Sequence, residues 1–202
     1  MIRSVCVYSS SSDAVAPPYV AAAEALGAAL ARRDVTLVFG GGRVGLMGVV
    51  ARAVHQNGGR VIGVIPDFMR SKEIAYEEAD ELVITKTMRE RKAIMEERSD
   101  AFVTLPGGFG TLEEILEIIT LKQLETHSKP VVLLNTRGFF NPLLVMFEQL
   151  YREGFTKEHY RGHYHVAAEP EAALHHLENY QPPPRVQKWF TATPPAKHDD
   201  PS

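Results

Sequence analysis

The chain has 202 residues, of which 45% are hydrophobic and 23% are charged, enough apolar material for the core of a soluble globular protein. Its 22 basic and 25 acidic residues give a net charge of −3 without clustering of either sign, so we expect no nucleic-acid partner. No apolar run approaches the roughly 18 residues of a membrane span, and the first run is too short for a secretory signal, so we expect a cytoplasmic protein without membrane contact.

Apolar runs alternate with amphipathic segments along the chain. The predicted strands are residues 3–8, 35–39, 60–65, 81–85, 101–105 and 131–135, with a weaker one at 164–167. The predicted helices are residues 20–32, 46–57, 88–98, 111–125, 141–153 and 169–179. Strands that alternate with helices form a parallel sheet covered on both faces. The sequence therefore predicts an α/β fold, a Rossmann-like doubly wound parallel sheet in a three-layer α/β/α sandwich.

The end of the chain changes character, because six of the 13 prolines follow Gln181. Proline fixes the backbone and lacks an N–H donor, so such a segment continues neither a helix nor a sheet. We predict one nucleotide-binding catalytic domain over residues 1–180 and an extended or disordered tail over 181–202.

Cys6 is the only cysteine, which excludes an internal disulfide and a zinc cluster built on thiolates. It lies in the first predicted strand, where we expect a small buried apolar side chain rather than a nucleophile. We predict no metal site and no cofactor.

Two glycine-rich loops follow predicted strands. Gly40, Gly42 and Gly45 fit the pattern G-x-G-x-x-G between a strand and a helix, and Asp67 ends the next strand where a ribose-binding carboxylate is expected. This pattern suits the binding of a dinucleotide such as NAD, whose phosphates lie against backbone amides at a helix start. The alternative is that these glycines form a tight turn and allow close helix packing.

The second loop runs from Pro106 to Thr111 and contains Gly107, Gly108 and Gly110. Its glycines leave the backbone amides uncovered at a helix start, which favours a phosphate. No lysine follows them, so the loop is not a Walker A motif. Thr111 and Glu114 also fit a capping box, in which the two side chains bond the first backbone amides of the helix. The spacing alone does not separate the two interpretations.

Arg91 interrupts an apolar helix face that it shares with Met88 and Met95. A guanidinium that points toward the sheet needs an anionic or carbonyl partner, and Glu114 is the natural candidate. The alternatives are a purely structural ion pair or a side chain that reaches solvent. Lys92 lies nearer the edge of the same face.

The segments TMRERK at 87–92 and PGGFGTLEE at 106–114 resemble the LOG (Lonely Guy) family, the cytokinin riboside 5′-monophosphate phosphoribohydrolases. The family signature is PGGxGTxxE with an upstream M-x-x-R-K, and the similarity extends over about residues 3–180. Arg89 stands where the family commonly has histidine, which leaves the choice of base substituent open.

The resemblance implies a hydrolase that cleaves the N-glycosidic bond of N6-modified AMP to the free base and ribose 5-phosphate. Arg91 and Glu114 match the catalytic residues. The resemblance also implies a nucleoside monophosphate as the ligand and a homodimer. The residues that match substrate-binding and phosphate-binding positions are Gly41, Gly42, Gly45, Met88, Lys92, Gly107, Gly108, Gly110 and Thr111.

The chemistry suits these residue types independently of the resemblance. A carboxylate near the anomeric carbon stabilises an oxocarbenium-like sugar and deprotonates a water, and we expect Arg91 to hold Glu114 ionised and aligned. Asp67 and Glu73 are weaker candidates. The sequence shows no Schiff-base lysine site with a partner for a pyridine nitrogen, so we reject the name lysine decarboxylase that the family often carries.

The predicted helix 111–125 has a wider apolar arc than one buried face requires, and an isologous homodimer explains it. Three other functions stay open from the sequence. They are an AMP nucleosidase that prefers AMP itself, an NAD-dependent oxidoreductase, and a nucleotide-binding protein without catalytic activity.

Overall fold

The computed structural model of the chain describes residues 2–70 and 74–182. Seven strands form one sheet in the order β4-β3-β2-β1-β5-β6-β7, and all neighbouring strands pair in parallel. The strands are β1 (Ser4–Tyr8), β2 (Thr36–Phe39), β3 (Val61–Pro66), β4 (Glu81–Thr85), β5 (Ala101–Thr104), β6 (Val131–Leu134) and β7 (His165–Ala167). All seven predicted strands are confirmed.

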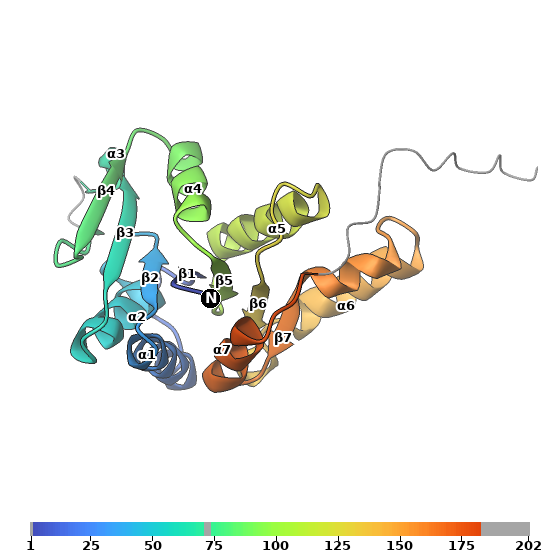
Figure 1. Cartoon of the computed structure of the whole chain (residues 1–202), viewed down its shortest axis with the longest axis horizontal. Helices are drawn as coiled ribbons and strands as arrows, with labels where there is room; N and C mark the ends of the chain where they lie inside the picture. The colour runs from blue at the N-terminus through green and yellow to red at the C-terminus, as the bar shows by residue number, and fades with distance from the viewer. Residues whose placement is uncertain (1, 71–73, 183–202) are drawn as a thin grey trace, which may run out of the picture.

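Helices cover both faces of this sheet, as Figure 1 shows. They are α1 (Pro17–Arg32), α2 (Gly45–Gln56), α3 (Asp67–Met69), α4 (Met88–Glu97), α5 (Phe109–Gln123), α6 (Asn141–Arg152) and α7 (Pro170–Glu178), with the 3₁₀ turns η2 (Thr136–Gly138) and η3 (Glu158–His163). One apolar layer joins α1, α2 and α7 to the sheet, and the other joins α4, α5 and α6 to its opposite face. The predicted three-layer α/β/α sandwich is confirmed.

The two apolar layers explain why the central strands read as continuous hydrophobic runs. In β1, Val5 and Val7 pack into the layer of α1 and α2, whereas Cys6 and Tyr8 pack into the layer of α4 and α5. Cys6 is fully buried, and burial raises the pKa of its thiol to about 12, so the predicted role as a small buried side chain is confirmed.

The order of the strands places a topological switch point between β1 and β5. The chain adds β2, β3 and β4 on one side of β1, and then β5, β6 and β7 on the other. In such sheets, ligands bind outside the carboxyl ends of the strands near the switch point. The loops after β1, β2 and β5 lie at this edge, together with the start of α5.

Three short helical turns, α3, η2 and η3, were not predicted, because three to six residues carry no helical periodicity. The predicted proline-rich tail lies outside the described residues from residue 183 onward. In the described part of the chain, no helix combines the length and the apolar character that a membrane crossing requires.

Candidate active site

Arg91 lies on the buried face of α4 and links β3 and the residue after β2 to α5. Its Nε donates a hydrogen bond to the carbonyl oxygen of Val64 at 3.1 Å, and Nη2 donates to the carbonyl oxygen of Gly40 at 3.1 Å. Its Nη1 donates to Oε1 of Glu114 at 2.9 Å. The predicted pairing of Arg91 with Glu114 is confirmed, and the guanidinium points toward the sheet as the helical spacing predicted.

Glu114 lies in the second turn of α5 and is 8% exposed. Burial raises the pKa of its carboxyl, and the charge and hydrogen bond of Arg91 offset only part of this rise. Arg91 therefore favours the ionised form of Glu114, in line with the expectation from the sequence, while burial sets the net direction of the pKa shift. A carboxylate with a raised pKa is a stronger base, which suits proton transfer from water.

The start of α5 excludes the capping-box interpretation of Thr111 and Glu114. The helix begins at Phe109 with Gly108 as its N-cap and no side-chain cap, so Thr111 lies three positions beyond the N-cap that a capping box requires. The capping residue of α4 is Thr87, whose Oγ1 accepts a hydrogen bond from the amide of Glu90. The spacing of these two residues is the sequence signal for this cap.

The second glycine loop presents open backbone at the start of α5. A Cβ atom at Gly108 or at Gly110 would meet no atom within 4 Å, and neither glycine has a positive φ. The amides of Phe109, Gly110 and Thr111 have no acceptor among the described residues, because they are the first amides of the helix. Packing within the chain does not require glycine at 108 and 110, whereas close approach of an anion to these amides does.

Gly107 differs from the other two glycines of this loop. A Cβ atom there would lie 2.1 Å from Oγ1 of Thr111. Glycine at 107 therefore allows the Thr111 hydroxyl, which is almost fully buried, to pack against the loop.

The first glycine loop is closed by contacts within the chain. The amide of Arg43 donates to the carbonyl oxygen of Ile74 at 2.8 Å, and the amide of Gly45 donates to Oδ1 of Asp13 at 2.7 Å. Gly45 has a φ of +61°, and its Cβ would lie 2.5 Å from the carbonyl oxygen of Ser10. The turn and the close packing account for this glycine, and Asp13 already occupies the place of an anion at the start of α2.

Gly41 and Gly42 have packing roles of the same kind. Gly41 has a φ of +72°, and a Cβ atom there would lie 2.9 Å from the Cβ atom of Ile65. A Cβ atom at Gly42 would lie 2.8 Å from the terminal methyl group of Met47. In the first loop the amides of Arg43 and Gly45 are already bonded within the chain, whereas the amides of residues 109–111 in the second loop have no acceptor among the described residues.

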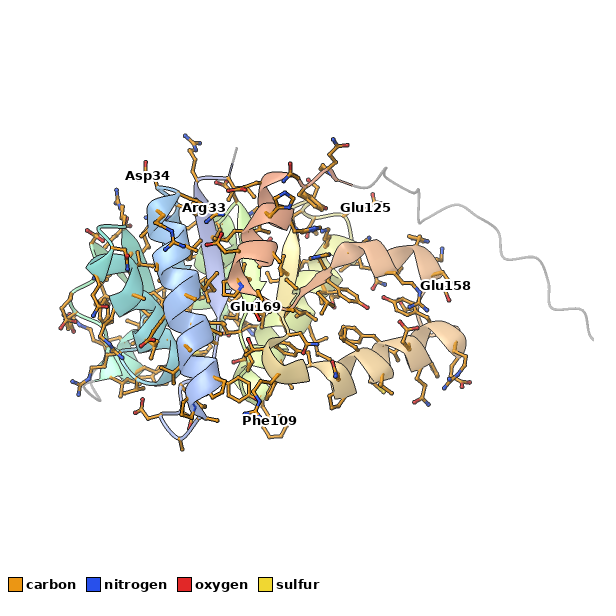
Figure 2. All side chains as sticks on the ribbon, turned by 90° about the horizontal axis from the view of Figure 1, so that it is seen from below. Arg33, Asp34, Phe109, Glu125, Glu158 and Glu169 are labelled. Carbon is orange, nitrogen blue, oxygen red and sulfur yellow. The ribbon has the colours of Figure 1, made fainter. Side chains whose placement is uncertain are left out.

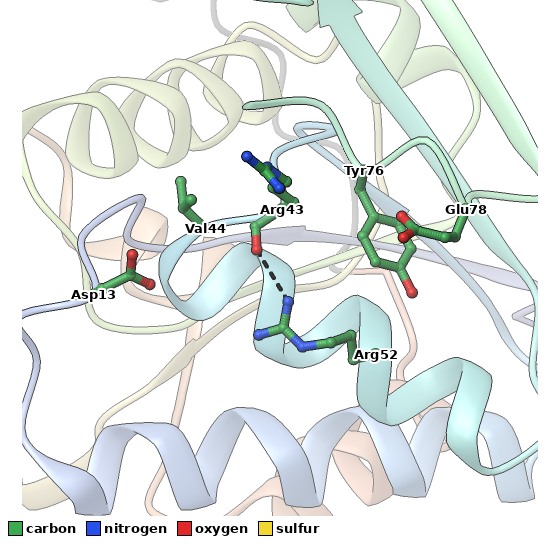
Figure 3. Close-up of a pocket in the computed structure, with 6 residues that line it drawn as sticks. All are labelled: Asp13, Arg43, Val44, Arg52, Tyr76 and Glu78. Carbon is green, nitrogen blue, oxygen red and sulfur yellow. Dashed lines mark hydrogen bonds between the residues drawn. The ribbon is translucent and has the colours of Figure 1, made fainter. Parts of the chain in front are cut away.

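A hollow of 340 Å³ borders the first loop and is lined by Asp13, Arg43, Val44, Arg52, Tyr76 and Glu78. Figure 3 shows the Arg52 guanidinium beneath the loop, where Nη1 donates to the carbonyl oxygen of Arg43 at 3.0 Å. Neither Arg91 nor Glu114 lines this hollow. It is a separate feature from the buried pair.

The remaining predicted site residues lie around the buried pair. The ammonium of Lys92 forms ion pairs with Glu113 and, at 2.8 Å, with Glu117, both of which lie on α5. Met88 is 39% exposed at the start of α4. Asp67 lies exposed in α3, and Glu73 lies outside the described residues.

Two polar side chains at the switch point are not among the predicted site residues. Oγ of Ser9 and Oγ1 of Thr104 are buried and have no hydrogen-bond partner among the described residues. Ser9 directly follows β1 and Thr104 is the last residue of β5, the two strands that flank the switch point. Their position after buried strands was the available signal, but a serine or threonine there is too common to be distinctive. Among the described residues, no group of three or more His, Cys, Asp or Glu side chains could hold a metal ion.

Known proteins are similar to this chain over most of its length. The family model described as "Possible lysine decarboxylase" matches residues 47–177. A protein of Oryza sativa subsp. japonica named "Probable cytokinin riboside 5′-monophosphate phosphoribohydrolase LOGL2" is 46% identical over 180 residues, which cover 89% of this chain and 74% of that protein. The Arabidopsis thaliana protein "Cytokinin riboside 5′-monophosphate phosphoribohydrolase LOG7" is 44% identical, with coverage of 89% and 83%.

A solved structure shares the fold. The molybdenum cofactor binding protein from the phototrophic bacterium Rippkaea orientalis superimposes with a TM-score of 0.68 over 88% of this chain and 96% of that chain, at 22% sequence identity. At this identity the likeness shows the fold alone.

Proposed function

The chain belongs to the family that contains these phosphoribohydrolases, and from this premise we propose that it hydrolyses the N-glycosidic bond of N6-modified AMP. The products are the free base and ribose 5-phosphate. The name lysine decarboxylase in the family description does not describe this reaction.

One observation carries the assignment of residues. Glu114, whose Oε1 lies 2.9 Å from Nη1 of Arg91 on α4, lies on the same helix as the open amides of Gly110 and Thr111. An anion-binding helix start and a buried carboxylate with a raised pKa are what cleavage of a nucleoside monophosphate requires.

The 5′-phosphate binds at the start of α5 in this proposal. Gly108 and Gly110 let the phosphate approach the backbone, and the amides of residues 109–111 donate to its oxygens, assisted by the helix dipole. Thr111 and Glu114 are three residues apart, so they lie on one helix face with Cβ atoms about 5–6 Å apart. The ribose then extends from the phosphate along this face toward Glu114.

Glu114 acts on the water and on the sugar. The bond between C1′ and the base nitrogen breaks with its electrons leaving on the base, and a bond forms between C1′ and the water oxygen. The Glu114 carboxylate accepts a proton from that water and, before this, stabilises the positive charge on the sugar. The base takes up one proton in exchange for the one that the water gives up.

Arg91 is a positioning residue in this proposal. Three of its N–H groups donate to Val64 in β3, to Gly40 directly after β2 and to Glu114, so the guanidinium fixes the orientation of the carboxylate relative to these two strands. Lys92 contributes through Glu113 and Glu117, because these contacts hold α4 against α5.

The structure gives the alternative functions less support. An NAD-dependent oxidoreductase needs the first glycine loop to receive a pyrophosphate, but the Gly45 amide is already bonded to the Asp13 carboxylate. The fold likeness to a molybdenum cofactor binding protein carries no function at 22% identity.

We also propose a cytoplasmic homodimer in which α5 contributes to the interface. Ile115 and Ile118 pack against the sheet, whereas Leu116 and Leu124 are 39% and 43% exposed in the single chain. The apolar arc of α5 therefore extends beyond the face that the chain itself buries, and a second copy would cover it.

Product analysis tests the proposed function. The full-length protein is incubated with N6-isopentenyl-AMP, with AMP and with NAD, and the products are separated by chromatography. We expect free base and ribose 5-phosphate, released faster from N6-isopentenyl-AMP than from AMP. Faster release from AMP would make the protein an AMP nucleosidase, and binding without release would make it a non-catalytic binding protein.

A further inference from the structure

A second group of buried polar side chains lies at the far end of α5 and is not used by the proposed reaction. Lys122 occupies the last turn of this helix and is 4% exposed, and its Nζ has no hydrogen-bond partner among the described residues. Lys122 follows Glu114 by eight residues on the same helix face, which places it about 12 Å farther along the axis. Figure 2 shows Phe109, the first residue of α5, well separated from Glu125, which lies just beyond the end of the helix.

Two further buried polar atoms near Lys122 also have no partner within the described part of the chain. They are Nδ1 of His163 in η3 and Oη of Tyr180 after α7. The Nζ of Lys122 lies 4.7 Å from the centroid of the Tyr180 ring, and η3, which carries His163, packs against α5. Unpaired buried polar atoms are rare in folded proteins, so three near one another indicate a missing partner.

The surroundings of these three groups are basic. Burial is the largest cause that lowers the pKa of His127, His163 and His176, and the charge of Lys122 lowers it further; among the described residues, no carboxylate contributes to these shifts. Burial alone lowers the pKa of Lys122 to about 8. Water could satisfy the hydrogen bonds, but only an anion would also compensate the charge.

The end of α5 does not supply this compensation. The carbonyl oxygens of Thr120, Leu121 and Lys122 already accept hydrogen bonds from the amides of residues 124–126. The His176 ring, whose centroid lies 3.9 Å from that of His165 and 5.9 Å from that of Tyr180, adds no negative charge.

We propose that Lys122, His163 and Tyr180 form a binding site for a small monovalent anion such as chloride or formate. The Lys122 ammonium, the Tyr180 hydroxyl and the Nδ1–H tautomer of His163 would each donate one hydrogen bond to it. Because the donors come from α5, η3 and the end of α7, the bound anion ties three segments together and stabilises the fold. The site is independent of the proposed hydrolysis.

Thermal unfolding of the full-length protein tests the site. The midpoint is measured against increasing chloride, formate or inorganic phosphate, with ionic strength held constant by the salt of a large sulfonate buffer. A ligand that binds only the folded state raises the midpoint as its concentration passes its dissociation constant. We expect chloride and formate to raise the midpoint of the wild type at lower concentration than phosphate, because the donors are enclosed.

Variants separate this site from general effects of salt. In Lys122→Met the loss of a charge-assisted hydrogen bond should weaken anion binding by at least about tenfold. The control Lys157→Met removes an exposed lysine, and its unfolding midpoint should respond to the anions as that of the wild type does. Tyr180→Phe keeps the ring and loses only the hydroxyl, so we expect a several-fold weaker response from a fold close to the wild type. An equal anion response in Lys122→Met and Lys157→Met would overturn the proposal. So would a wild type without any response, or an unchanged response in Tyr180→Phe.

Discussion

Replacement of Arg91 by methionine tests how the buried pair is held. The substitution keeps an unbranched side chain but removes the hydrogen bonds to Val64, Gly40 and Glu114. Removal of one partner from a buried ion pair costs about 3–5 kcal/mol, and each carbonyl left without a donor adds to this. We therefore expect the free energy of unfolding to fall by at least about 4 kcal/mol, a large share of the 5–15 kcal/mol typical of a domain.

Denaturant unfolding followed by circular dichroism measures this loss, with Lys92→Met as the matched control. Lys92 pairs with the half-exposed carboxylates of Glu113 and Glu117, so its loss should cost only about 1 kcal/mol. The double variant Arg91→Met/Glu114→Leu should recover most of the loss, because no buried charge then stays unpaired. A loss below about 1 kcal/mol in Arg91→Met, or no recovery in the double variant, would refute the reasoning.

The pH dependence of Arg91→Met has a defined sign. The pKa of the Glu114 carboxyl is already raised in the folded wild type, and loss of the arginine charge raises it further. A carboxyl with a raised pKa in the folded state stabilises the fold fully below its unfolded value and loses that contribution as pH rises through the folded value. The deficit of Arg91→Met should therefore grow as pH rises above 4.5, the ordinary pKa of a glutamate carboxyl, and a constant deficit would contradict the burial of the carboxylate.

Three other results follow from the structure. Gly108→Ala should leave the unfolding midpoint nearly unchanged, because its Cβ meets only open space within the chain, but it should weaken substrate binding. Gly107→Ala should destabilise the fold by about 1–3 kcal/mol through the clash with Thr111. Unfolding and KM are measured for both variants, and the reverse pattern would contradict the phosphate site. Cys6 should not react with a thiol reagent in the folded protein, since burial raises its pKa to about 12, and rapid labelling without denaturant would disprove this. Leu116→Glu should convert the proposed dimer to a monomer in light scattering, because it charges an exposed apolar position on α5; a wild type that is already monomeric would refute the dimer.

The layers of the fold were predictable because each strand and each long helix carries its own periodicity. Continuous apolar runs marked strands buried on both faces, such as β1 and β6. The burial of Arg91 followed from helical spacing alone, since it shares a face with Met95, which is fully buried.

The parts that failed depend on contacts between distant segments. The start of α5 at Phe109 rather than near Thr111 was hidden because glycines give no local signal for the first helical residue. The closure of the first glycine loop required Asp13, a residue 32 positions before Gly45. The raised pKa of Glu114 reflects how completely the surrounding elements exclude water, which composition and spacing do not report.

The most direct test of the proposed reaction compares two glutamates one turn apart on α5. Glu114→Gln keeps the size of the buried side chain but removes the carboxylate, and Glu117→Gln makes the same change where the carboxylate only pairs with Lys92. With N6-isopentenyl-AMP as substrate, we expect the kcat of Glu114→Gln to fall about a thousandfold, within the range for loss of a general base. The kcat of Glu117→Gln should stay within about threefold of the wild-type value, a change of under 1 kcal/mol in the activation free energy. Base release by folded Glu114→Gln at the wild-type rate would contradict the assignment of Glu114 to the chemistry.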